Sequence, residues 1–97
     1  MKLKSIKPSP NPDKKLVATF ESDDGRTKTT HFGAKGMDDY TKTHDPEQRR
    51  RYIERHGRGS ENWSDPTSAG ALSRYILWGE STSLARNIAA FRKRFSL

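Results

Sequence analysis

The sequence contains no cysteine, which excludes disulfide bonds and thiolate-bound metal sites. It also has no long hydrophobic run, and nothing in it approaches the roughly 18–20 apolar residues of a membrane-spanning helix. The first seven residues lack the apolar stretch of a signal peptide. We therefore expect an intracellular protein with no membrane association.

Hydrophobic residues are scarce, at 30% of the 97 residues against 32% charged. A chain of this length forms one domain and buries only about 60–65% of its unfolded surface. Such a polar composition is also found in disordered chains. The aromatic residues, however, recur at strand and helix spacings, which favours a single folded domain over residues 1–97.

Acidic residues are few in the second half of the chain. The net charge is +7, of which residues 1–48 contribute nine Lys/Arg minus eight Asp/Glu, or +1. Residues 49–97 contribute ten minus four, or +6, and nine of those ten cations are arginine. The planar guanidinium fork suits phosphate or carboxylate. An attractive surface should therefore be built by the second half.

The first third predicts an antiparallel sheet. Leu16, Ala18 and Phe20 alternate with more polar residues, as in a half-buried strand. The turn at residues 23–25 and a second strand over residues 26–32 complete a hairpin. Residues 3–7 should add an edge strand, which ends at a run of prolines.

Three helices are expected in the remainder, which makes the fold class α+β. Capping signals predict helices that begin at Asp45-Pro46, at Asp65-Pro66 and at Ser81 or Ser83. Gln48 lies at the capping-box position of the first helix. In the last helix an apolar stripe predicts one buried side; it consists of Leu84, Ile88, Phe91 and Phe95. Residues 33–36 should be a flexible exit from the sheet, and residues 37–44 a polar connector.

Several segments of the chain resemble a known family. They are HFGAKGMDDYT at residues 31–41, the arginine-rich run that leads into His56-Gly57, NWSDP at residues 62–66, and AGALSRYILWG at residues 69–79. This pattern resembles small basic proteins of unassigned function from giant double-stranded DNA viruses, the nucleocytoplasmic large DNA viruses. The resemblance covers about two-thirds of the chain. It implies a viral setting, in the host cell or the virion, and no activity.

Two basic clusters are candidate phosphate-binding sites. The first consists of Arg49, Arg50, Arg51, Arg55 and Arg58, and the second of Arg86, Arg92, Lys93 and Arg94. Ion pairs with Glu47 and Glu54 would make the first cluster an ordinary solvated helix instead. In the second cluster, cations near a helix C-terminus are also favoured by the helix dipole.

Other constellations favour structural roles. Most aromatic residues of the helices should pack in the core, and Trp63 is the one that could stack on a base. The loop at residues 33–36 contains a lysine but lacks the P-loop pattern. The three histidines have no metal-ligand spacing, and no catalytic arrangement is legible.

These patterns predict a non-enzymatic protein, without cofactor or metal, that contacts DNA phosphates without sequence specificity. The alternative is a minor capsid or other virion protein that uses the same arginines to bind carboxylates of viral capsid proteins. The choice among DNA, RNA and protein partners, and the oligomeric state, stay open at this point.

Overall fold

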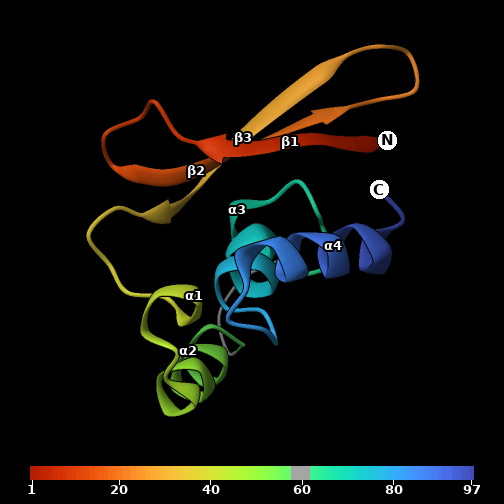
Figure 1. Cartoon of the computed structure of the whole chain (residues 1–97). Coiled ribbons are helices and arrows are strands. Elements are labelled where there is room, and N and C mark those ends of the chain that lie inside the picture. The colour runs from red at the N-terminus through yellow and green to blue at the C-terminus, as the bar shows by residue number, and fades with distance from the viewer. Residues whose placement is uncertain (58–61) are drawn as a thin grey trace.

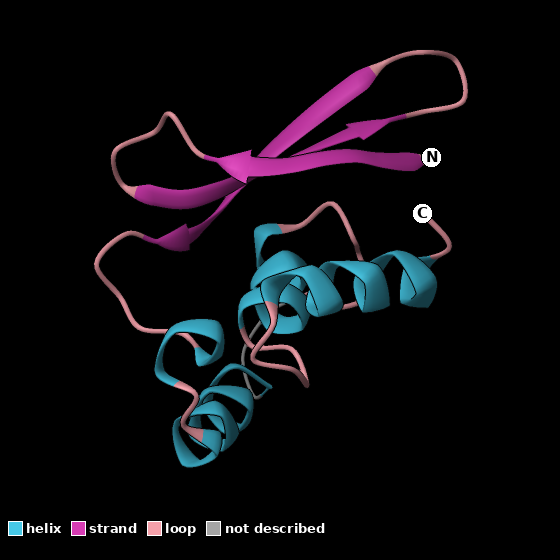
Figure 2. Ribbon diagram, in the orientation of Figure 1, coloured by secondary structure: helices cyan, strands magenta, loops and turns pink. Residues whose placement is uncertain are grey.

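The computed structural model describes residues 1–57 and 62–97. Strands come first and helices follow, which confirms the predicted α+β class. The elements in chain order are β1 (Lys2–Pro8), β2 (Lys14–Glu21), β3 (Thr27–Ala34), α1 (Tyr40–Thr43), α2 (Pro46–Gly57), α3 (Ala69–Leu72), the π-helix η1 (Ser73–Leu77) and α4 (Leu84–Phe95). All the helices lie on one face of the sheet (Figures 1 and 2).

The three strands form an antiparallel meander in the order β1-β2-β3, which confirms both the hairpin and the edge strand. Leu16 pairs with Phe32 across the hairpin, and Phe20 pairs with Leu3 of β1. At the hairpin turn Gly25 has a φ of 87°, a left-handed conformation that glycine adopts without steric cost. The period-2 pattern therefore correctly identified the buried face.

The expected exit loop at residues 33–36 is partly wrong, because β3 continues through Ala34, which pairs with Lys14. Gly33 has a φ of 79°, and a Cβ atom there would lie 2.6 Å from Cδ1 of Leu77. Glycine is therefore needed in this strand because η1 packs directly against it. The polar connector that follows contains the short helix α1.

Helix α2 begins as predicted. Oδ1 of Asp45 accepts hydrogen bonds from the backbone N–H groups of Glu47 (3.0 Å) and Gln48 (3.3 Å), as an N-cap residue does. The expected capping box does not form, because the Gln48 side chain turns to α1 and its Oε1 accepts a hydrogen bond from the Thr43 hydroxyl. A tertiary contact between two helices replaces the local one.

The second predicted helix is shorter than expected and begins later. Asp65 does not cap it: its carboxylate accepts hydrogen bonds from the backbone N–H and the hydroxyl of Thr67 in a turn. Ser68 is the N-cap and accepts from the backbone N–H of Ala71. After the single α-helical turn of α3, the chain continues as the wider π-helix η1. Its i to i+5 hydrogen bond joins the Trp78 N–H, just after η1, to the Ser73 carbonyl oxygen at 2.9 Å.

One hydrophobic core joins the sheet to the helices. Its largest fully buried side chains come from β2, β3, α3, η1 and α4: Phe20, Phe32, Leu72, Ile76 and Phe91. At one end of the core, Tyr52 of α2 stacks on Trp78 with ring centroids 4.3 Å apart. At the other end, the Arg92 guanidinium donates to the Leu3 carbonyl oxygen at 3.1 Å and ties α4 to β1.

Candidate nucleic-acid interface

Helix α4 confirms the predicted third helix and separates its side chains into faces. Ser83 is the N-cap, with its hydroxyl accepting from the backbone N–H of Arg86. The apolar stripe faces the core, with Phe91 fully buried. Arg86, Ala90 and Arg94 recur every fourth residue, so they lie on a second face together with Lys93. This face borders η1.

The π-helix η1 supplies the opposite wall of the site. It is enclosed by α4, by β3 and, through Trp78, by α2. Ile76 and Leu77 face the core, which leaves Arg74 and Tyr75 half-buried toward α4. Single π-turns inside helices occur frequently at functional sites. Here the wide turn places an arginine and an aromatic ring beside the basic face of α4.

Arginines and aromatic rings alternate in a stack at this junction. The Arg74 guanidinium lies 5.2 Å from the Trp63 ring centroid and 5.0 Å from that of Tyr75. The Arg94 guanidinium lies 4.3 Å from the same Tyr75 ring. Stacking fixes the orientation of each planar guanidinium and leaves its N–H groups at the edge of the stack. We call these four residues the Arg–aromatic stack.

The electrostatics of the Arg–aromatic stack favour an anion. Burial lowers the pKa of Arg74, and the nearby positive charges of Arg49 and Arg94 lower it further. Arginine nonetheless stays protonated at any physiological pH. Within the described part of the chain, Nε of Arg74 is buried and has no hydrogen-bond partner. Three guanidinium groups are therefore held near one another in a partly desolvated place, and a bound anion would relieve their repulsion.

A pocket of about 620 Å³ opens between η1 and α4 beside the Arg–aromatic stack. It is bordered by four basic side chains and one carboxylate, together with apolar and small residues: Arg74, Arg86, Lys93, Arg94, Glu80, Tyr75, Gly79, Ser81, Asn87, Ala90 and Phe91. Among residues 1–57 and 62–97, no ion pair engages any of the four cations. The charges of Arg86, Lys93 and Arg94 are therefore available to a ligand, whereas the Arg74 guanidinium also donates from Nη1 to the Trp78 carbonyl oxygen at 3.2 Å.

The wall of the pocket is held by Asn87, which is 2% exposed. Its Nδ2 donates to the carbonyl oxygens of Ile76 (2.8 Å) and Ser81 (2.7 Å), and its Oδ1 accepts from the Ser81 N–H. These bonds fasten the loop after η1 to the first turns of α4. The pocket is thus part of the packed fold and is formed before any ligand binds.

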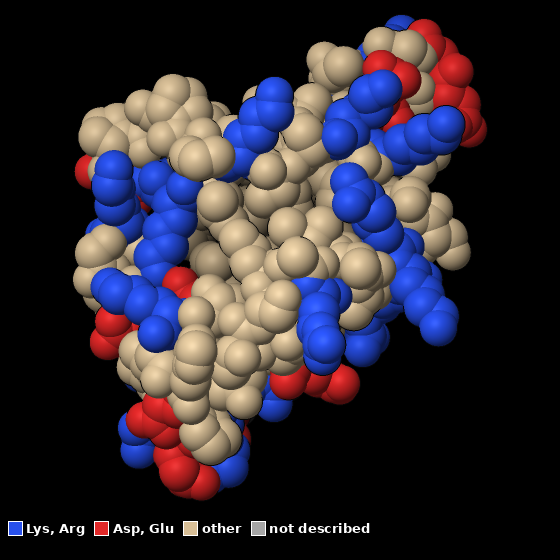
Figure 3. Space-filling model, in the orientation of Figure 1, with Lys and Arg blue, Asp and Glu red and all other residues tan. Residues whose placement is uncertain are grey.

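The surface of the molecule has its charges partly segregated (Figure 3). On the face shown, Lys and Arg side chains lie around α4 and the neighbouring end of β1, and also at the left of the view, at the other end of the sheet. Acidic side chains collect at the tip of the β2–β3 hairpin and on α2. The cations around α4, together with those at the other end of the sheet, would therefore attract a polyanion that approaches this side.

The arginines of α2 do not form one free surface. Nε of Arg49 donates to the carbonyl oxygens of Trp78 (3.2 Å) and Gly79 (2.9 Å), so this side chain ties α2 to the end of η1. Arg50 forms ion pairs with both Glu47 and Glu54, as in an ordinary solvated helix.

The remaining cations of the two predicted clusters lie in different places on the molecule. Arg51 and Arg55 are exposed on α2, whereas Arg58 lies outside the described residues. Arg92 points to β1 and is separated from Arg86, Lys93 and Arg94. The structure therefore brings together three of the predicted phosphate ligands, all on α4.

Trp63 is half-buried, and Arg74 lies over its ring. Its Nε1 is buried without a hydrogen-bond partner among the described residues. Trp63 therefore orients an arginine instead of presenting a free face to a base. Arg74 itself was missed in the sequence, because it stands in an apolar helical segment. The sequence does contain one signal for Arg74. Tyr75 directly follows it, and Trp63 comes earlier in the chain.

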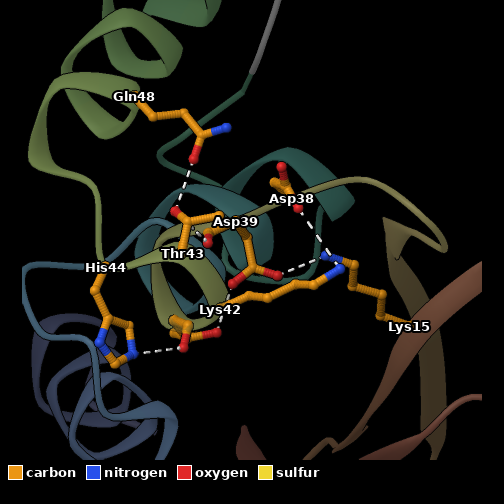
Figure 4. A network of polar contacts seen from close by, with 8 residues as sticks. Lys15, Asp38, Asp39, Lys42, Thr43, His44 and Gln48 are labelled. Atoms are coloured by element: carbon orange, nitrogen blue, oxygen red, sulfur yellow. Dashed lines mark hydrogen bonds and ion pairs between the residues drawn. The ribbon is translucent and has the colours of Figure 1, made fainter.

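A second cavity of about 360 Å³ lies at the other end of the sheet, and polar contacts hold its wall together (Figure 4). Asp39 is 3% exposed and forms an ion pair with Lys15 at 2.5 Å. The Thr41 hydroxyl also donates to this carboxylate. The adjacent Asp38 pairs with Lys42 at 3.6 Å on the surface. These pairs fasten α1 to the sheet and balance one another in charge, so we assign this network a structural role.

In the described part of the chain, no three His, Asp or Glu side chains converge to hold a metal ion. None of the described helices is long and apolar enough to cross a bilayer.

A model of a protein family of unknown function, DUF5754, matches residues 4–56. The match spans more than half of the 97 residues, and the chain belongs to this family. Comparison with curated proteins and with solved structures finds no match. The matched segment contains nearly all of the sheet, α1 and nearly all of α2, whereas the pocket between η1 and α4 lies beyond it.

Proposed function

We propose that this protein binds the phosphate backbone of nucleic acid, without sequence specificity and without catalysis, through η1 and α4. One observation carries the proposal: among the described residues, four basic side chains border a pocket in which a single carboxylate opposes them, and two of the four are oriented by stacking. Oriented guanidinium groups suit phosphate oxygens because they donate two parallel hydrogen bonds. Within residues 1–57 and 62–97, no element matches a base-reading motif.

The setting in a large DNA virus belongs to this proposal and rests on the resemblance described above. Such a virus must neutralise a long genome. A small protein with a net charge of +7, concentrated in one half of its chain, suits that task. The same cations would also bind carboxylates on capsid proteins, and the experiment below separates the two partners.

The test is binding to random-sequence duplex DNA over a series of salt concentrations. Each phosphate contact contributes about 0.9 to the slope of log affinity against log salt. A triple variant with Arg86, Lys93 and Arg94 replaced by Gln should reduce the slope by about two to three and weaken binding to all sequences alike. Circular dichroism would show whether the variant retains its fold.

The matched control replaces the exposed α2 arginines, Arg50, Arg51 and Arg55, by Gln. It removes the same charge but should reduce the slope less, because Arg50 is already paired with two glutamates. A larger loss in the α2 variant would move the site to that helix. If the unmodified protein binds no DNA even at low salt, nucleic-acid binding is refuted and acidic capsid surfaces become the partner to test.

A further inference from the structure

We infer that the pocket between η1 and α4 receives one unpaired nucleotide, so that the preferred ligand is single-stranded nucleic acid. This inference rests on the proposed function and specifies the form of nucleic acid that is bound. Three properties of the pocket support this inference: its size, its lining and its single carboxylate.

The first property is size. A phosphate group of a duplex can be bound by a convex basic surface and needs no cavity. The pocket has a volume of about 620 Å³, within the roughly 300–1,000 Å³ of sites for small organic ligands. Exposed Ala90 lines the pocket with a side chain of a single methyl group, between Arg86 and Arg94 on the same helix face. The space suits a base together with its phosphate.

The second property is the separation of cations from apolar surface. Tyr75 and Ala90 contribute apolar atoms to the lining, with the buried ring of Phe91 behind them, while the arginines and Lys93 contribute positive charge. A nucleotide has the same two-part character, with an apolar aromatic ring and an anionic phosphate. Proteins that bind single strands combine aromatic or apolar surface with a basic groove in this way.

The third property is the carboxylate of Glu80. Within the described residues it is the one acid that borders the pocket, and it takes part in no ion pair there. A carboxylate beside a site for phosphate alone would repel the ligand. It can, however, accept a hydrogen bond from the amino group of a base, a group that adenine, cytosine and guanine all carry. The presence of Glu80 therefore favours a ligand that contains a base.

A duplex could fill the pocket only after one of its nucleotides is unstacked and unpaired, which costs a few kcal/mol. A single strand has unpaired bases already. The protein should therefore bind a short single strand about tenfold or more tightly than a duplex of the same length and sequence.

The experiment measures fluorescence anisotropy of labelled single-stranded and duplex DNA, and of a single strand of equal length that lacks bases, all at one low salt concentration. We expect the single strand to bind most tightly and the abasic strand to lose that advantage. The variant Ala90→Leu, which places a larger side chain in the pocket, should lose most of the preference for the single strand over the duplex.

Ala89→Leu is the matched control, because Ala89 is exposed on the same helix and does not border the pocket. Leucine keeps the helix propensity high and adds no aromatic ring or charge. This control should behave as the unmodified protein does.

Two outcomes would overturn the inference and leave the proposed function intact. One is equal affinity for the single strand and the duplex, with the salt dependence preserved. The other is a single-strand preference that survives in Ala90→Leu or in the abasic strand, since the pocket would then not be its cause. Absence of binding to every DNA form would refute the proposed function as well.

Discussion

Replacing Lys15 by Met should destabilise the protein strongly, because it leaves the Asp39 carboxylate buried without its cation. The two groups form an ion pair at 2.5 Å, and their side chains are 19% and 5% exposed. Removing one partner of a buried pair costs about 3–5 kcal/mol. Since Lys15 retains some access to water, we expect the lower end, about 3 kcal/mol. For a protein of this size the Tm should fall by about 12–24 °C.

The neighbouring pair provides the control. Asp38 and Lys42 are 3.6 Å apart and more than half exposed, so Lys42→Met should change the free energy of unfolding by less than about 0.5 kcal/mol. Both variants remove one lysine from adjacent contacts of α1 and lower the net charge equally (Figure 4). Their difference therefore isolates burial from overall charge.

Urea unfolding, followed by tryptophan fluorescence, gives both free energies. A double variant, Lys15→Met with Asp39→Asn, should recover part of the loss, because the group that stays buried is then neutral. The reasoning is refuted if Lys15→Met and Lys42→Met lie within about 0.5 kcal/mol of each other. It also fails if the double variant is less stable than Lys15→Met alone.

Two further predictions concern a glycine and a carboxylate. Gly79→Ala should destabilise by about 2 kcal/mol or more, because its Cβ would lie 2.5 Å from Cγ of Asn87. Among the described residues, a Cβ at Gly57 would meet the Trp63 ring at 3.5 Å, an ordinary contact, so Gly57→Ala should be nearly neutral in the same urea titrations. The N–H and hydroxyl of Thr67 lower the pKa of Asp65, so this carboxylate stabilises the fold above its unfolded pKa, and that contribution is lost as the pH falls through the lower folded value. Asp65→Asn should therefore weaken the loss of stability at acid pH, and an unchanged urea midpoint profile would contradict this.

The sequence by itself determined the elements whose signals are local. The alternation around Phe20 identified the hairpin and its buried face, and the spacing from Leu84 to Phe95 identified α4 and its buried stripe. Asp45 was a correct N-cap because it bonds to N–H groups two and three residues away. Such patterns lie within a few residues of chain, where sequence and geometry correspond closely.

The tertiary structure decided the start of the second helix and the form of its last turn. Asp65 and Ser68 are both good N-cap residues, and the helix begins after Ser68 because Thr67 is held against β3, where the Thr30 hydroxyl donates to its carbonyl oxygen at 2.7 Å. The pocket wall depends on Gly79 and Asn87, which interlock across the loop between η1 and α4. No local sequence signal distinguishes the π-helical turn of η1 from an α-helical turn. The wider turn is selected by the packing of η1 against its neighbours on several sides.

The tertiary structure also decided which arginines are available. In sequence Arg49, Arg92 and Arg94 look alike, yet Arg49 binds carbonyl oxygens after η1, Arg92 binds one in β1, and Arg94 lies over Tyr75 beside the pocket. Arg74 joins the site only because η1 faces α4. Charge is a property of the residue, whereas its availability depends on neighbours that are distant in sequence. Composition could therefore predict a basic half, and only the packed chain could place its candidate site.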